Sequence, residues 1–161
     1  MNELLKLLEK DAQLTPEMLG AMLDKNPEEI KKQISEYEKD GTIAGYNALI
    51  DWEKTEREYV TALIELKVTP QRDLGFDRVA ERIYNYPEVQ SLYLMSGGFD
   101  LCVVIEGKTM REVALFVAEK LATMESVIST ATHFVLRKYK DKGIVMKRGD
   151  VDIRSELSDG V

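Results

Sequence analysis

The first 43 residues carry apolar side chains at helical spacing in three short stretches, which predict helices over residues 2–10, 16–23 and 27–40. Thr15 and Asn26 stand just before the second and third stretches, and each is followed by proline. A capping residue followed by proline is typical of a helix start. Because only three residues separate the second stretch from the third, the pair is predicted to form a helix-turn-helix.

The pattern changes at Thr42, where helical spacing ends. Residues 43–49 have the length and composition of a short strand, and the charged residues that follow, 50–57, suit a connection between domains. We therefore predict a winged helix-turn-helix domain over residues 1–50 and a linker over residues 51–58.

The rest of the chain alternates between strand-like and helix-like patterns. The predicted order is strand, helix, strand, strand, helix, strand, over residues 59–68, 76–83, 89–96, 100–107, 110–121 and 127–139. This order is that of a ferredoxin-like βαββαβ domain, so the fold class is α+β. The domain is predicted over residues 59–143 and is followed by a tail over residues 144–161.

An antiparallel sheet of this kind has two faces, and its two helices cover only one of them. The other face is expected to carry Tyr59, Leu63, Phe134 and Leu136, or the residues that alternate with them. An apolar face of this size needs cover. A second copy of the same domain is the simplest cover, so a homodimer is predicted.

Composition places the chain among soluble globular proteins, since 44% of its residues are hydrophobic and 32% are charged. There is no apolar run long enough to cross a membrane and no secretory signal at the start, so no membrane association and a cytoplasmic location are expected. The net charge is −7, and residues 1–58 hold 8 Lys and Arg against 14 Asp and Glu. A DNA-binding domain usually has a basic surface, which this half lacks.

Two motifs and the domain order carry a family resemblance. The segment GTIAGYNALID, residues 41–51, follows the third helix, and MSGGFDLCVVIEG, residues 95–107, forms a predicted hairpin. Together with the domain order over residues 2–143, these segments resemble the Lrp/AsnC (feast/famine) transcription regulators. The resemblance implies sequence-specific binding to double-stranded DNA and a RAM-type sensor domain for an amino acid or related small metabolite. It also implies a dimer that can assemble further into octamers.

The third helix is the candidate for reading DNA. If Ile30, Ile34 and Tyr37 face the core, the opposite side presents groups that can contact phosphates or bases; we expect DNA contacts from Lys31, Lys32, Gln33 and Ser35. An ordinary solvated helix face is the alternative. This chain also departs from the family, which often has basic residues at positions 33, 35 and 36 and glycine in the turn where Asp24 and Lys25 stand.

The predicted hairpin is the candidate ligand site. Glycine backbone amides can bind a carboxylate, and an aspartate can bind an ammonium group. The expected ligand-binding residues are Gly97, Gly98, Phe99, Asp100, Thr130 and Thr132. The alternatives are a plain hairpin in which Asp100 caps its own turn and a loop that makes a contact between subunits.

Signals for catalysis are few. His133 is the only histidine and has no cysteine or acidic partner at metal-ligand spacing, and Cys102 lies in an apolar strand. No phosphate-binding loop or nucleophile elbow is present, so no enzyme activity, cofactor or metal is expected. Two other hypotheses stay open: a metabolite-binding assembly protein that does not bind DNA, and an enzyme on the same architecture, similar to siroheme decarboxylases.

Overall fold

The computed structural model describes residues 2–70 and 75–146. The chain divides between Leu49 and Ile50 into two compact units, each with its own core. None of the helices described is long and apolar enough to cross a membrane.

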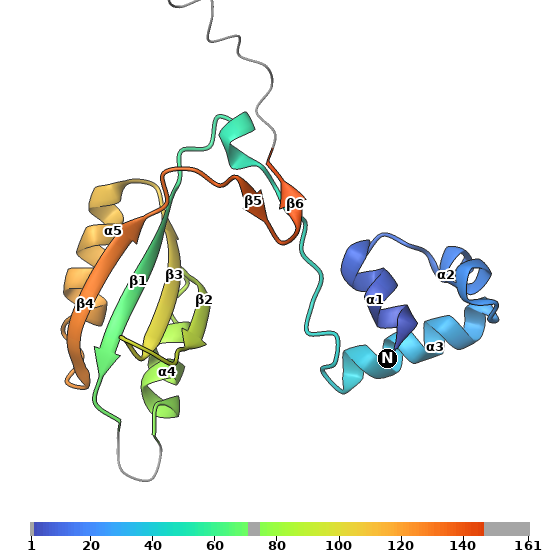
Figure 1. The fold of residues 1–161 in the computed structure, drawn as a ribbon, viewed down its shortest axis with the longest axis horizontal. Coiled ribbons are helices and arrows are strands. Elements are labelled where there is room, and N and C mark those ends of the chain that lie inside the picture. Colours follow the sequence, from blue (N-terminus) through green and yellow to red (C-terminus); the bar gives the residue numbers. More distant parts are fainter. Residues whose placement is uncertain (1, 71–74, 147–161) are drawn as a thin grey trace, which may run out of the picture. The chain divides into compact units, whose positions relative to one another are not determined.

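Three helices make up the first unit (Figure 1): α1 (Glu3–Lys10), α2 (Pro16–Leu23) and α3 (Pro27–Lys39). Both predicted caps are present. The hydroxyl of Thr15 accepts a hydrogen bond from the Met18 N–H at 3.3 Å, and the side chain of Asn26 accepts one from the Glu28 N–H at 2.9 Å. These bonds satisfy N–H groups that have no partner inside the helix.

The turn between α2 and α3 depends on two positions. Asp24 adopts a left-handed conformation with φ of 52°, where glycine is the usual residue. Gly20 lies buried at the crossing, and a Cβ atom there would stand 2.7 Å from the carbonyl oxygen of Lys25. The close approach of the two helices therefore requires glycine at position 20. The core of this unit is small and consists of Leu4, Leu8, Leu19 and Ile30.

The strand predicted over residues 43–49 is not formed. Ile43 packs against the helical core, and its N–H donates to the Tyr37 carbonyl, but residues 44–48 are exposed. Residues 2–49 contain no hydrogen-bonded strand. A strand needs a second strand to accept and donate its backbone hydrogen bonds, and this unit offers none.

The second unit is a four-stranded antiparallel sheet with strand order β2-β3-β1-β4, which confirms the predicted ferredoxin-like topology. A short 3₁₀ turn (Trp52–Lys54) precedes it. Its elements are β1 (Val60–Val68), α4 (Asp77–Tyr84), β2 (Val89–Leu94), β3 (Leu101–Gly107), α5 (Met110–Phe116) with a π-helical continuation (Val117–Leu121), and β4 (Val127–Phe134).

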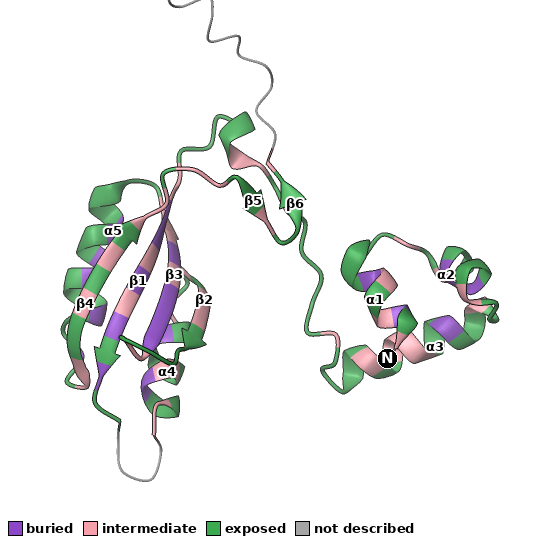
Figure 2. Ribbon diagram, viewed as in Figure 1, coloured by how far each residue is buried: buried purple, intermediate pink, exposed green. Residues whose placement is uncertain are grey.

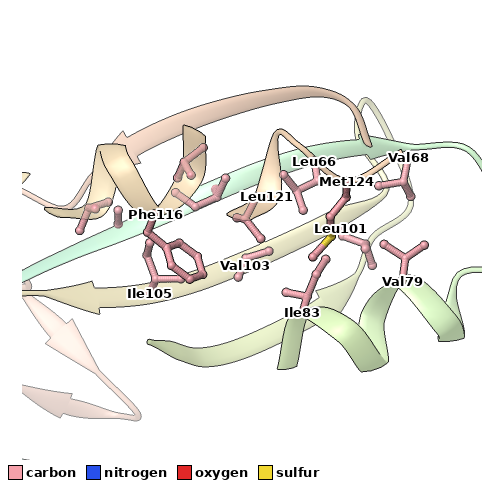
Figure 3. Close-up of a cluster of buried hydrophobic side chains, with 14 residues drawn as sticks. Leu66, Val68, Val79, Ile83, Leu101, Val103, Ile105, Phe116, Leu121 and Met124 are labelled. Atoms are coloured by element: carbon pink, nitrogen blue, oxygen red, sulfur yellow. The ribbon is translucent and has the colours of Figure 1, made fainter. Parts of the chain in front are cut away.

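The core lies between the sheet and the two helices (Figure 3). Alternate residues of β1, namely Ala62, Ile64, Leu66 and Val68, are buried there, as the alternation predicted. On α5 the buried residues are Val113 and Phe116, whereas Ala114 between them is exposed. The wider π-helical turn follows and keeps Val117 and Leu121 on the sheet.

The last predicted strand is shorter than expected. β4 ends at Phe134 instead of residue 139, because β1 begins at Val60 and offers no further partner beyond the bond from the Val135 N–H to the Thr61 carbonyl. A small hairpin, β5 (Lys140–Asp141) and β6 (Ile144–Val145), comes next, so residues 144–146 belong to it and not to a tail. The rest of the predicted tail, residues 147–161, lies outside the described residues.

Within the described part of the second unit, α4 and α5 both lie on the same side of the sheet, and no helix of this unit covers the second face (Figures 1 and 2). Directly paired residues point to the same side of a sheet. Leu63 pairs with Val104 and His133, so all three belong to this open face, as predicted for Leu63. Phe134 pairs with Ala62 and packs on the helix side, so its predicted place on the open face was wrong and His133 takes it.

We predict that Gly20→Val destabilises the first unit by about 1–3 kcal/mol, because the added atoms meet the Lys25 backbone. Ala21→Val on the exposed side of α2 is the matched control and should cost well under that, about 0.5 kcal/mol. Urea unfolding followed by circular dichroism, with hydrogen exchange of α2 and α3 amides, measures both. Equal effects of the two variants would contradict the close-approach argument.

Candidate functional site

The outward face of α3 brings together three of the four residues predicted to contact DNA. Lys31 and Lys32 are exposed, Ser35 is half-buried, and all three border one surface hollow. Gln33 is turned away from them. Its side-chain nitrogen donates to the Tyr37 hydroxyl at 2.9 Å, so this amide holds α3 together instead of standing free on the outward face.

The outward face of α3 carries both basic and acidic side chains. The hollow is bordered by Glu28, Lys31, Lys32, Ser35, Glu36 and Lys39. Lys31 also acts on the start of α2. The Glu17 carboxylate accepts hydrogen bonds from the backbone of Glu17 itself and from the Thr15 side chain, and these bonds lower the pKa of Glu17. The positive charge of Lys31 lowers this pKa further. The arrangement offers cations for phosphates, with carboxylates between them.

The loop between β2 and β3 is a tight hairpin. The Met95 N–H donates to the Asp100 carbonyl at 2.8 Å and closes it. Gly97 has φ of 137°, a conformation that residues with a side chain rarely adopt. Gly97 and Gly98 are exposed and Phe99 is half-buried, so the backbone of the loop is accessible to a ligand.

Asp100 holds this loop to the neighbouring strand. Its Oδ2 accepts a hydrogen bond from the Val68 N–H at 2.9 Å, and its own N–H donates to the Leu66 carbonyl at 2.9 Å. The carboxylate thus satisfies a backbone donor of β1 where the ladder with β4 is irregular, between Lys67 and Val68. This is a structural role toward another strand, which none of the roles predicted from the sequence for Asp100 included.

Thr130 and Thr132 do not meet the hairpin within one chain. They pair with Leu66 and Ile64, which places them on the helix side of the sheet. β1 separates β4 from β3, so two strand spacings, roughly 10 Å, lie between Thr130 and the end of the hairpin. A single small ligand bound by all of the predicted residues would need a different arrangement from that in one chain.

The open face holds a polar pair that sequence spacing did not reveal. His133 Nε2 lies 3.3 Å from a carboxylate oxygen of Glu65 on the next strand. Burial raises the pKa of the nearby Cys102 thiol, and Glu65 adds to the effect, so the cysteine stays protonated at neutral pH. The part of the chain that the structure describes contains no cluster of three such groups able to hold a metal. Strand register, which brings Glu65 beside His133, was the missing signal.

Comparison with known proteins decides the family. Residues 61–145 match the model of the Lrp/AsnC ligand binding domain. The chain is also 48% identical over 157 residues to the uncharacterized HTH-type transcriptional regulator YugG of Bacillus subtilis (strain 168), covering 97% of this chain and 95% of that protein. The chain belongs to the Lrp/AsnC family. This is a family of transcription regulators and not of enzymes, and the relatives of this chain are named as transcriptional regulators.

Solved structures of this family share the fold. The transcriptional regulator NMB0573 of Neisseria meningitidis, crystallised as its L-Met complex, matches with a TM-score of 0.69 at 22% identity, covering 86% of this chain and 88% of its own. AsnC of E. coli matches with a TM-score of 0.67 at 17% identity, covering 89% and 97%. The predicted α+β class is confirmed by these matches.

We predict that Asp100→Ala destabilises the second unit by about 1–3 kcal/mol, because the half-buried Val68 N–H loses its acceptor. Asp100→Asn is the matched control: its amide oxygen can still accept the bond, so the loss should be smaller. Urea unfolding of the full chain measures both. An Ala variant as stable as the parent protein would show that the bond does not hold the loop.

Proposed function

We propose that this Lrp/AsnC protein is a transcription regulator that binds specific double-stranded DNA and whose DNA affinity or assembly responds to an amino acid or related metabolite. Membership of the family carries the proposal. The α2–α3 pair supports it, because two helices joined by three residues present α3 with Lys31 and Lys32 exposed on its outward face.

The DNA-binding unit is proposed to act as a winged helix-turn-helix. The segment after α3 supplies the chain for a wing, and Tyr46 is held near α3 by a 3.0 Å hydrogen bond from its hydroxyl to Glu38. Residues 44–48 are exposed and have backbone groups available for pairing. A strand would form there when a second polypeptide strand supplies a partner.

We propose a homodimer formed through the open face of the sheet. Apolar residues stand at the centre of that face around the Glu65–His133 pair, and edge residues such as Tyr93, with 54% of its surface exposed, border it. The central residues are Leu63, Cys102, Val104 and Ala131. Covering such a surface removes apolar area from water, worth about 25 cal/mol per Å². Because each copy offers the same face, a two-fold dimer satisfies both at once, and further assembly into an octamer is proposed on the family resemblance.

The effector site is proposed at the β2–β3 hairpin. The exposed amides of Gly97 and Gly98 suit a carboxylate. Since one chain does not bring Thr130 and Thr132 to the hairpin, the ligand is proposed to sit between copies. The L-Met complex of the neisserial regulator supports an amino acid as the chemical class.

A sensor that binds no DNA is the second candidate, and the charge of the first unit favours it. Residues 1–49 hold 6 Lys and 10 Asp or Glu. Phosphate contacts supply most non-specific affinity, so few cations predict weak binding by one copy. Two or more copies that engage several half-sites recover affinity through avidity.

Replacing both lysines, Lys31→Ala with Lys32→Ala, is expected to weaken specific DNA binding. Each of the two lysines that contacts a phosphate makes the slope of log affinity against log salt shallower by roughly 1 when it is removed. The matched control is Lys6→Ala with Lys10→Ala, which removes the same charge from exposed positions on α1. Fluorescence anisotropy at several salt concentrations measures it. Equal losses in the two double variants would mean that net charge, and not the α3 face, governs binding.

Val104→Glu is expected to break the dimer. An unpaired charge at the centre of a buried face costs about 3–5 kcal/mol, which raises the dimer dissociation constant by at least about 100-fold. Leu115→Glu on the outer side of α5, where 46% of the side chain is exposed, is the matched control. Sedimentation velocity reports both. A Val104→Glu protein that remains dimeric would exclude this face as the interface.

A further inference from the structure

The outward face of α3 alternates in charge along one helical row. Glu28, Lys32 and Glu36 follow each other at intervals of four residues and border the same hollow, of about 330 Å³. Residues four apart lie above one another on a helix surface. A DNA duplex that meets α3 would therefore meet two carboxylates as well as the lysines.

These carboxylates are not neutralised by the lysines beside them. Over residues 2–70 and 75–146 the ion pairs join Asp51 with Lys54, Glu65 with His133, and Lys138 with Asp141. All three pairs lie in the second unit, so α3 contributes no side chain to any of them. Glu28 and Glu36 are exposed, so a duplex that lies on this face would meet both carboxylates.

A carboxylate in the major groove has few favourable partners. Phosphates repel it, and the edges of guanine and the thymine carbonyl present acceptors that a carboxylate cannot bond. The exocyclic N4 amine of cytosine is its usual donor, whereas lysine bonds O6 and N7 of guanine. A glutamate on the reading face thus lowers affinity for most sequences and raises discrimination in favour of cytosine.

Glu28 is the better placed of the two. Residues near the N-terminus of a recognition helix contact the base edges, and Glu28 is the second residue of α3. Its backbone is also fixed, because its N–H donates to the Asn26 cap at 2.9 Å. Lys32 stands one turn further along the same row.

We propose that Glu28 is a specificity-determining residue that selects a C·G base pair by accepting a hydrogen bond from cytosine, with Lys32 on a neighbouring guanine. This inference rests on the proposed DNA-binding function. It assigns to the acidic character of the first unit a role in sequence discrimination, separate from affinity.

The test begins with the full-length protein and a pool of random duplexes, from which the preferred sequence is selected at low salt. Affinities are then measured for every single base-pair substitution of that sequence, with the parent protein, Glu28→Gln and Glu29→Gln. Glu29 is the matched control, because it is exposed in the same turn and carries the same charge but does not border the hollow. Both variants remove one negative charge.

The parent protein and the Glu29→Gln protein should favour cytosine at one position by roughly 5- to 150-fold. Glu28→Gln should reduce that preference to a few-fold or move it to adenine, which glutamine bonds, and leave the other positions unchanged. If both variants changed the affinity for all duplexes equally, the role of Glu28 in base selection would be wrong, but the proposed DNA-binding function would stand. Selection that yields no preferred duplex with the parent protein would overturn the proposed function and this inference with it.

Discussion

The strict alternation of side chains along β1 is the constraint on which the second unit depends. Ala62, Ile64 and Leu66 point to α4 and α5, and the residues between them must point the other way. Covering one face with helices therefore leaves Leu63, and Val104 beside it, on a face that water meets in a single chain. The same geometry that builds the core creates the surface through which two copies are proposed to join.

The proposed pairing of two copies also matters for DNA affinity, because the first unit has few basic residues. One α2–α3 pair offers few cations, and its carboxylates oppose the phosphates, so a single copy gains little from electrostatics alone. In the proposed dimer, two units joined through their second domains would engage two half-sites, and the second contact would form at a high effective concentration. The affinity lost to an acidic reading face would then be offset by dimerisation, while the proposed preference for particular bases would remain.

Local signals allowed much of this fold to be predicted from the sequence. Features that depend on contacts between distant residues could not be predicted. Thr15 and Asn26 marked helix starts because a cap acts within three residues, and alternation marked β1 because the helices cover only one face of the sheet. The end of β4 could not be predicted, since it depends on where β1 begins. The hydrogen bonds from Gln33 to Tyr37 and from Val68 to Asp100 could not be predicted either, because they depend on side-chain positions and strand register. Both bonds give a structural role to a residue that was predicted to bind DNA or ligand.

We propose that pairing through the second unit gives this chain its specific DNA binding. The most direct measurement titrates duplex DNA from upstream of its own gene, and unrelated DNA, with the parent protein and the Val104→Glu protein at low and near-physiological salt. A mixture of amino acids is added in a parallel series. We expect specific binding by the parent protein that survives near-physiological salt and shifts with the amino acids, and we expect the Val104→Glu protein to lose it. Equal, salt-sensitive binding to both DNAs, or a monomeric variant that binds as tightly as the parent protein, would contradict it.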